Sequence, residues 1–145
     1  MAIGQGNGKM MRAIKRILVV DGEKEFADTV TRHLKRKKFI TQSASNGADA
    51  REIINETTCP VSQYDLVITD VIMPKVSGIE LLQWIKNHHS EISVLIVSGL
   101  GSQNMVKKTI RPAMDDCCQK PVTPDEMMRL IGTINNKRKT HQMRR

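Results

Sequence analysis

The stretch Asp65-Leu-Val-Ile-Thr-Asp-Val-Ile-Met-Pro74 decides the fold. Its residues 66–69 are apolar or β-branched, which predicts a strand buried on both faces. Asp70 ends this run, and Pro74 turns the chain into a loop soon afterwards. A carboxylate at the carboxyl end of a buried strand is costly unless it is paired or used, and ligands bind at this edge of open α/β sheets. Asp70 therefore either caps a loop or belongs to a site.

The length of 145 residues suits one domain with short extensions. Only 3% of the residues are aromatic, so the core must consist of Ile, Leu, Val and Met. Nine of the 23 basic residues lie in segments 1–16 and 137–145, which contain no acidic residue. The segment between them has 14 basic and 15 acidic residues, a net charge of −1. We therefore expect a disordered basic tail at 1–13, one nearly neutral domain at 14–136 and a basic tail or linker at 137–145.

The net charge of +8 has no nucleic-acid-binding motif beside it, so we do not expect direct nucleic-acid binding. No apolar run is long enough to cross a bilayer, and residues 4–9 are too polar for a signal segment, which indicates a cytoplasmic protein. Cys59, Cys117 and Cys118 form no CxxC pair and have no zinc spacing, so they are interpreted as reduced thiols. The histidines show no metal-ligand pattern either.

Apolar runs and helical periodicities alternate along the whole chain. They predict strands at 14–20, 39–44, 65–70, 92–97 and 115–119 and helices at 24–37, 46–55, 78–88, 102–110 and 123–136. Because several strands are apolar throughout, we expect an α/β fold with a five-stranded parallel sheet covered by five helices on both faces. Right-handed crossovers gather the carboxyl ends of parallel strands at one edge. There the sequence places Asp21, Asp70, Ser98 and Lys120.

These four side chains have complementary chemistry. The carboxylates of Asp21 and Asp70 would repel each other at close range unless a cation lay between them, and such hard oxygen ligands suit Mg²⁺. Lys120 supplies a positive charge and Ser98 a hydroxyl donor. A carboxylate nucleophile, a divalent metal, a lysine and a hydroxyl donor together indicate a phosphoryl-transfer site.

The chain resembles the receiver domain of two-component response regulators over residues 14–136, nearly everything but the tails. The motifs that carry the resemblance are Ile17-Leu18-Val19-Val20-Asp21, the stretch 65–74 with Ser77-Gly78, the segment 94–99 and Lys120-Pro121. Each motif is weak alone, but their order and spacing are highly specific. The resemblance implies a doubly wound, flavodoxin-like fold with strand order 2-1-3-4-5.

The resemblance also implies a reaction. Asp70 would accept a phosphoryl group from a histidine kinase or a histidine phosphotransfer protein. Asp21 and Asp70 would hold Mg²⁺ together with the backbone carbonyl of Ile72. The protein would in this way catalyse its own Mg²⁺-dependent phosphorylation and dephosphorylation, with no separate metabolic activity.

Two further residues receive roles from the same resemblance. Ser98 would be the switch hydroxyl that turns toward the acyl phosphate, and Lys120 would contact the phosphoryl oxygens. The bond between Lys120 and Pro121 would be cis. The resulting shift of the 98–122 surface would change the binding of a downstream protein target, while pairing into a homodimer through the last two helices and the last strand is left open.

One departure from the family pattern opens an alternative function. The family usually has two acids after the first strand, the second being a metal ligand, and here the second position is Gly22. Glu23 is adjacent and could reach in, but neighbouring loop positions point in different directions, so we do not count on its carboxylate entering the site. The alternative is therefore a receiver-fold binding module with impaired phosphorylation.

Other departures concern signalling and lifetime. Cys117 replaces an aromatic residue that often swings inward in the family, and Val122 stands where a Phe is common. Ile72 and Leu100 flank the site with apolar side chains, which should hinder the water that hydrolyses an acyl phosphate. An unrelated flavodoxin-like enzyme is not expected, because the glycine-rich run 4–8 precedes the first strand instead of following it.

Overall fold

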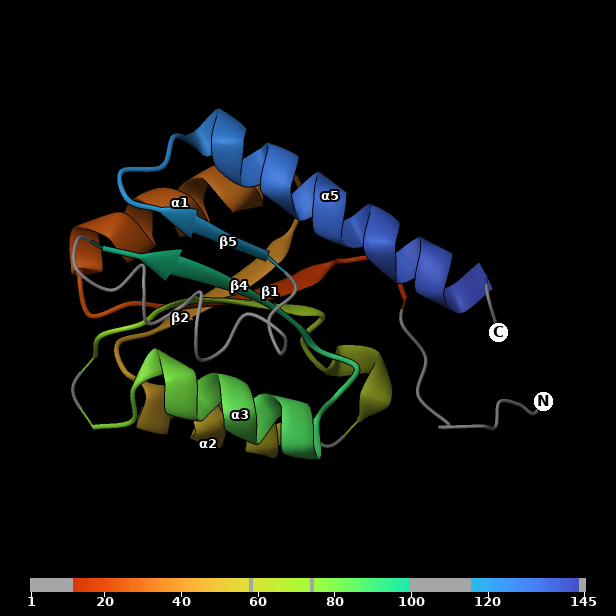
Figure 1. The fold of residues 1–145 in the computed structure, drawn as a ribbon, viewed down its shortest axis with the longest axis horizontal. Coiled ribbons are helices and arrows are strands. Elements are labelled where there is room, and N and C mark those ends of the chain that lie inside the picture. The colour runs from red at the N-terminus through yellow and green to blue at the C-terminus, as the bar shows by residue number, and fades with distance from the viewer. Residues whose placement is uncertain (1–11, 58, 74, 100–115, 144–145) are drawn as a thin grey trace.

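The protein folds around one parallel sheet (Figure 1). The computed structural model describes residues 12–57, 59–73, 75–99 and 116–143. The strands are β1 Arg16–Val20, β2 Ile40–Ala44, β3 Leu66–Asp70, β4 Ser93–Ser98 and β5 Asp116–Gln119. They lie in the order β2-β1-β3-β4-β5, and every neighbouring pair is parallel. The predicted doubly wound sheet and its strand order are confirmed.

Helices cover both faces of this sheet. The described helices are α1 Lys24–Arg36, α2 Gly47–Glu56, α3 Gly78–His88 and α5 Pro124–Met143, with the 3-10 turn η2 at Pro60–Ser62. Figure 1 shows α1 and α5 on one face and α2 and α3 on the other. The predicted helix at 102–110 and most of the predicted N-terminal tail, residues 1–11, lie outside the described residues.

The three central strands, β1, β3 and β4, are mainly apolar because each contributes to two cores. In β1, Ile17 and Val19 belong to the cluster beneath α1 and α5, whereas Leu18 and Val20 belong to the cluster beneath α2 and α3. This division follows from the alternation of side chains along a strand. All four of these side chains have zero exposure. Two-sided burial holds the strand ends, and hence the polar residues that follow them, in fixed positions.

The last helix extends further than the sequence predicted. We expected it to end near residue 136, but α5 continues to Met143. The reason is a contact between distant parts of the chain: the side chain of Arg138 is 2% exposed and donates hydrogen bonds to the carbonyl oxygens of Arg12, Asp65 and Glu91. Arg12 and Arg138, both assigned to basic tails from the sequence, therefore belong to the folded domain.

The first strand is shorter than predicted, beginning at Arg16 instead of residue 14. The backbone N–H groups of Lys15 and Arg16 donate to the Asp65 carboxylate at 2.9 and 3.0 Å, and the N–H of Ile14 donates to the side chain of Asn135 at 3.0 Å. Residues 14 and 15 are thus fixed by side-chain acceptors outside the regular ladder. The second strand likewise begins one residue later than predicted, at Ile40.

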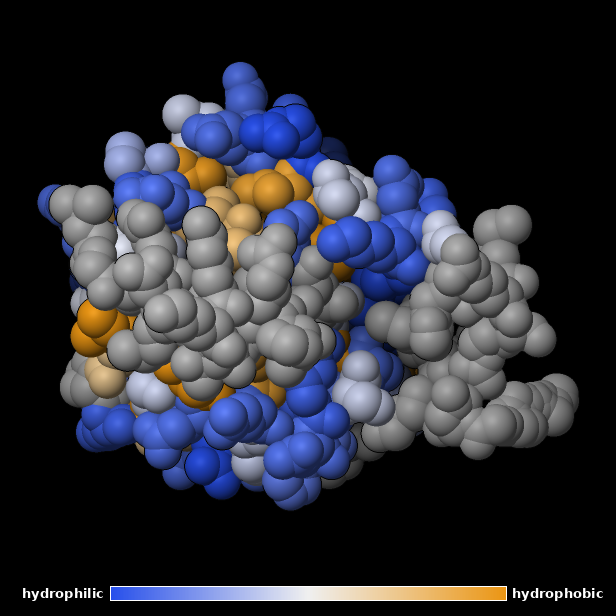
Figure 2. Space-filling view, in the orientation of Figure 1, coloured by the Kyte–Doolittle hydropathy of each residue, from blue (hydrophilic) through white to orange (hydrophobic). Residues whose placement is uncertain are grey.

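On the face drawn in Figure 2, the described side chains over the helices are mostly polar. Figure 2 shows hydrophilic side chains over the outer faces of α5 and α3, with hydrophobic side chains between α5 and the sheet. Within the described ranges, no helix has the length and apolar character needed to span a bilayer.

Candidate functional site

The carboxyl edge of the sheet brings the four predicted residues together from four strands. Asp21 directly follows β1, Asp70 ends β3, Ser98 ends β4 and Lys120 directly follows β5. The register places Asp70 beside Val97, one residue before Ser98. Parallel pairing therefore gives these side chains a common edge, as the sequence predicted.

Lys120 connects the carboxylates of this edge. Its Nζ lies 2.9 Å from Asp21 Oδ2 and 3.4 Å from Asp70 Oδ2. A third carboxylate, that of Glu23, is nearer still, with Oε1 at 2.5 Å. The Phe26 ring lies on another side of the ammonium, with its centroid 4.5 Å away. One cation thus stands among three anions, and the local charge is negative.

Asp21 is the buried member of the cluster, with a side chain only 2% exposed. Its Oδ1 accepts a hydrogen bond of 2.8 Å from the Glu23 N–H. Its Oδ2 has the Lys120 ammonium as an ion-pair partner but no hydrogen bond of regular geometry among the described residues. Burial raises the pKa of Asp21 above its ordinary value, and the contacts to Lys120 and the Glu23 N–H only partly oppose this shift.

Asp70 is held in place but remains accessible. Its Oδ1 accepts a hydrogen bond of 2.7 Å from the Val71 N–H, and its side chain is 16% exposed. The backbone beyond it is tightly packed, since the N–H of Gly78 donates to the Val71 carbonyl at 2.8 Å. A Cβ atom at Gly78 would meet the Asp70 carbonyl oxygen at 1.9 Å, so only glycine fits there. The start of α3 thereby packs against the backbone of Asp70 and Val71.

Ser98 and the cis peptide bond complete the edge. Ser98 is buried, and its hydroxyl donates a long hydrogen bond of 3.4 Å to the Cys118 carbonyl. The Lys120 N–H donates to the Ser98 carbonyl at 2.8 Å, which ties the end of β5 to the end of β4. The Lys120–Pro121 bond is cis, as the family resemblance implied. Ile72, whose carbonyl was implied as a metal ligand, has a side chain that is 69% exposed.

The residue that sequence reasoning missed is Glu23. We did not count on its carboxylate entering the site, yet it makes the shortest contact with Lys120. The hydrogen bond to Lys120 lowers the pKa of Glu23. Burial lowers the pKa of Lys120, but the close contacts with the carboxylates of Glu23 and Asp21 outweigh it, so the net shift is upward and the ammonium stays charged. The signal in the sequence was the acidic residue itself, which stands one position after Gly22, where the family usually has its second acid.

The other departures from the family pattern lie beside this edge. Cys117 is partly buried and packs against the core beneath α2 and α3, and Val122 packs against the core beneath α1 and α5. The three cysteines are free thiols, as predicted. Burial raises the pKa of the Cys118 thiol to about 11, so it stays protonated near neutral pH. Leu100 lies outside the described residues.

Comparison with known proteins identifies the family. A model of the response regulator receiver domain matches residues 17–132. The chain belongs to this family. Among curated relatives, this receiver is similar to the response regulator protein PilR of Pseudomonas aeruginosa, with 29% identity over 82% of this chain and 26% of PilR. It is also similar to the CpxR homolog, a transcriptional regulatory protein of Haemophilus influenzae, with 30% identity over 83% of this chain and 50% of that protein.

The relatives are longer and diverse. A 3',5'-cyclic-nucleotide phosphodiesterase of Dictyostelium discoideum, regA, is 33% identical over 82% of this chain but only 15% of its own length. The receiver thus spans half or less of the lengths of these three relatives. Among solved structures, a receiver domain protein from Clostridium thermocellum has a TM-score of 0.78 and 27% identity, covering 88% of this chain and 98% of that one. Response regulator TrrA of Thermotoga maritima, solved with Mg²⁺-BeF, has a TM-score of 0.71 and 24% identity over 83% of this chain and 99% of TrrA.

Proposed function

We propose that this receiver accepts a phosphoryl group on Asp70 from a phosphorylated histidine of a kinase or phosphotransfer protein. The observation that carries the proposal is the Lys120 ammonium between the buried Asp21 and the accessible Asp70. A lysine in this position can neutralise charge on a phosphoryl group as it arrives at Asp70. The family membership supports the same reaction.

In the proposed step, an oxygen of Asp70 forms a bond to phosphorus while the bond from phosphorus to the donor imidazole breaks. The electron pair of that bond returns to the imidazole ring, and the donor leaves as a free histidine. The Val71 N–H holds the Asp70 carboxylate in a fixed orientation through its 2.7 Å hydrogen bond, so little reorganisation precedes the attack.

The donor set of the site fits Mg²⁺. Asp21 Oδ2 and Asp70 Oδ2 lie 2.9 and 3.4 Å from the same Lys120 nitrogen, so two hard anionic ligands converge on one point. In the parts of the chain that the structure describes, no group of three or more acidic, histidine or cysteine side chains is placed so that it could hold a metal ion. Two carboxylates, those of Asp21 and Asp70, would hold the ion, with the Ile72 carbonyl that the family resemblance implies and water as the remaining ligands. When bound, Mg²⁺ supplies further neutralisation of the phosphoryl oxygens.

Ser98 supports a switch that follows phosphorylation. Its present hydrogen bond to the Cys118 carbonyl is long, at 3.4 Å, and costs little to exchange. A phosphoryl group on Asp70 would offer strong acceptor oxygens to this hydroxyl. Rotation of Ser98 would then alter the packing between the ends of β4 and β5 and change the surface offered to a downstream protein.

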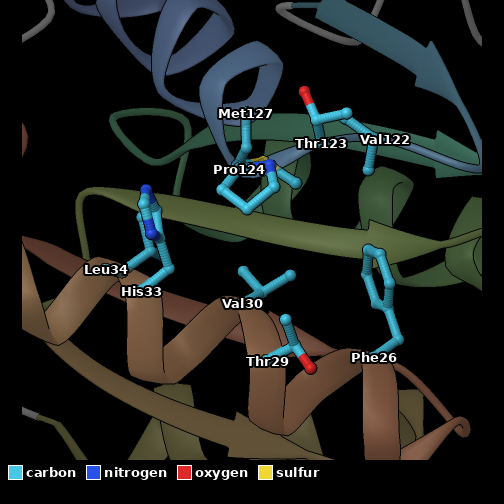
Figure 3. A pocket seen from close by; sticks show the side chains of 9 residues that line it. All are labelled: Phe26, Thr29, Val30, His33, Leu34, Val122, Thr123, Pro124 and Met127. Atoms are coloured by element: carbon cyan, nitrogen blue, oxygen red, sulfur yellow. The ribbon is translucent and has the colours of Figure 1, made fainter.

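A hollow beside Lys120 offers a route for the phosphoryl donor. It is lined by residues 23–26 at the start of α1 and by Lys120, Pro121 and Val122. A smaller groove that shares Phe26 and Val122 with this hollow lies between α1 and the start of α5 (Figure 3), where Val30 faces Pro124 and Phe26 faces Val122. We propose that the donor protein docks across this α1–α5 side, because the histidine would then approach Lys120 and Asp70 from solvent.

The test is intact mass after incubation with acetyl phosphate, with and without Mg²⁺, for the wild type and Asp70→Asn. The expected result is one labile phosphoryl group that requires both Mg²⁺ and Asp70. The variant should show no added mass while retaining its fold, because asparagine keeps the shape of the side chain but is not a nucleophile. Circular dichroism provides the control for folding.

The opposite outcome would favour the alternative function. If neither acetyl phosphate nor a phosphorylated histidine donor adds mass in excess Mg²⁺, the missing carboxylate at Gly22 has disabled the chemistry. The protein would then act as a receiver-fold binding module. Phosphorylation that persists in Asp70→Asn would instead show that a different residue is the acceptor.

A further inference from the structure

The Lys120 ammonium is not centred on the phosphoryl acceptor. Its contacts lengthen from 2.5 Å at Glu23 to 2.9 Å at Asp21 and 3.4 Å at Asp70. The nearest partner is thus a carboxylate that follows Asp21 by two positions, and the most distant is the proposed nucleophile. In the present state, Lys120 is displaced toward α1.

The backbone of the β1–α1 turn explains why Glu23 reaches this lysine. The Asp21 carboxylate accepts the N–H of Glu23, which folds the turn back over Asp21. Glu23 is also the N-cap of α1, and its carbonyl accepts the N–H of Ala27 at 3.1 Å. N-cap side chains normally accept a hydrogen bond from the first helical turn, but that of Glu23 makes none. Its carboxylate is therefore available for Lys120.

We propose that Glu23 is a positioning residue that holds Lys120 in a resting place and competes for it with the phosphoryl group on Asp70. This inference rests on the proposed function. An ammonium has three N–H donors, and here three carboxylates surround it. The N–H group of Lys120 that points toward Asp70 can donate to one phosphoryl oxygen instead. A shorter contact between the ammonium and the phosphoryl group requires the ammonium to move toward Asp70 and away from Glu23.

Exposure decides which partner is released. The side chain of Glu23 is 68% exposed, whereas those of Asp21 and Asp70 are 2% and 16% exposed. A carboxylate that loses its partner is easily rehydrated at the surface and poorly rehydrated in the interior. The contact to Glu23 therefore breaks at the smallest cost, and Asp21 stays paired through the change.

The experiment compares Glu23→Gln and Glu23→Asp with the control Glu25→Gln. Glu25 lies in the first turn of the same helix and is exposed, so its substitution removes an equal charge from the same segment. The probe is beryllium trifluoride at saturating Mg²⁺, which resembles a phosphoryl group on a carboxylate, with affinity measured from amide NMR shifts. The affinity for Mg²⁺ in the absence of beryllium trifluoride is measured separately.

Both Glu23 variants should bind beryllium trifluoride about 2- to 5-fold more tightly than the wild type does, a change typical of releasing one exposed ion pair. Glu23→Asp retains the charge but is one methylene shorter, so it should lose the contact with Lys120 and behave like Glu23→Gln. Aspartate is a favoured N-cap, so α1 should be retained. Glu25→Gln should match the wild type, and Mg²⁺ affinity should be the same in all four proteins.

Several outcomes would overturn the inference. A wild-type affinity in Glu23→Asp, or tighter binding in Glu25→Gln, would show that charge alone acts and that the contact does not. A loss of Mg²⁺ affinity in Glu23→Gln would make Glu23 a metal ligand. If the wild type shows no binding of beryllium trifluoride that depends on Asp70, the proposed phosphoryl-acceptor function is wrong, and the proposed role of Glu23 is wrong with it.

Discussion

The two edges of the sheet carry charge clusters of opposite composition. At the carboxyl edge, Lys120 is one cation among three carboxylates, and the cluster keeps a surplus of negative charge. At the amino edge, Asp65 is one carboxylate between the guanidinium groups of Arg12 and Arg138. The first cluster opens to solvent beside a hollow, whereas Asp65 and Arg138 are 3% and 2% exposed at the side chain.

The difference lies in how completely the charges are satisfied. Asp65 Oδ1 accepts from Arg12 at 2.6 Å, and its Oδ2 accepts two backbone N–H groups. Arg138 donates to three carbonyl oxygens and to the Ser93 hydroxyl, at distances from 2.7 to 3.1 Å. The amino edge is a closed network that joins the two ends of the domain. The carboxyl edge remains incomplete, as the proposed binding of a cation and a phosphoryl group requires.

The largest effect should come from breaking the amino edge with Asp65→Ala. The substitution removes a buried carboxylate that pairs with Arg12, lies 3.8 Å from Arg138 and accepts the N–H groups of Lys15 and Arg16, and losing one partner of a buried charge network costs about 3–5 kcal/mol. Urea unfolding measures the loss. The control is Asp28→Ala, which removes an exposed pair with Lys24 and should leave stability within error. A loss below about 1 kcal/mol for Asp65→Ala would mean that this edge is not the structural one.

An intermediate effect should come from Gly78→Ala at the carboxyl edge. The added Cβ would lie 1.9 Å from the Asp70 carbonyl oxygen, a backbone atom that cannot yield cheaply. We expect a loss of about 1–3 kcal/mol, typical of overpacking, and slower phosphorylation because Asp70 is displaced. Urea unfolding and intact mass after acetyl phosphate measure the two effects.

The matched control for Gly78→Ala is Gly132→Ala in α5, where a Cβ meets nothing within 4 Å. There alanine should stabilise the helix by about 0.5–1 kcal/mol and leave phosphorylation unchanged. Equal behaviour of the two variants would show that Gly78 does not position Asp70.

The carboxyl edge could be predicted from sequence because local rules place it. Apolar strands of a parallel sheet have their ends at one edge, so Asp21, Asp70, Ser98 and Lys120 had to gather there. Glu23 could not be placed in the same way. Its direction depends on a hydrogen bond from its own N–H to Asp21, and no periodicity encodes such a contact.

The amino edge was missed for a different reason. Its pairs join residues far apart, with Arg12 and Arg138 separated by 126 positions, and such pairing leaves no local pattern. Two signals were nevertheless present. Asp65 immediately precedes an apolar strand, and Arg138 follows Ile134 by one helical turn on the buried side of α5. A charged residue at a position where the helical pattern calls for an apolar one indicates a buried charge with a partner. The basic ends of the chain contain two such partners for Asp65, namely Arg12 and Arg138.

The smallest effect, and the most direct test of the contrast, should come from Asp70→Asn. Asparagine Oδ1 can still accept a hydrogen bond from the Val71 N–H, and the substitution removes one negative charge from a cluster with an excess of carboxylates. We expect stability in Mg²⁺-free buffer to rise by about 0.5–1 kcal/mol, opposite in sign to the change at Asp65. Added Mg²⁺ should stabilise the wild type, because a ligand of the native state raises unfolding free energy, and should stabilise the variant less. Thermal melts with and without Mg²⁺ measure both effects, with Glu25→Gln as the control for removal of a nearby charge. If Asp70→Asn were less stable than the wild type without Mg²⁺, then Asp70 would be a required partner of Lys120, and both edges of the sheet would be structural clusters.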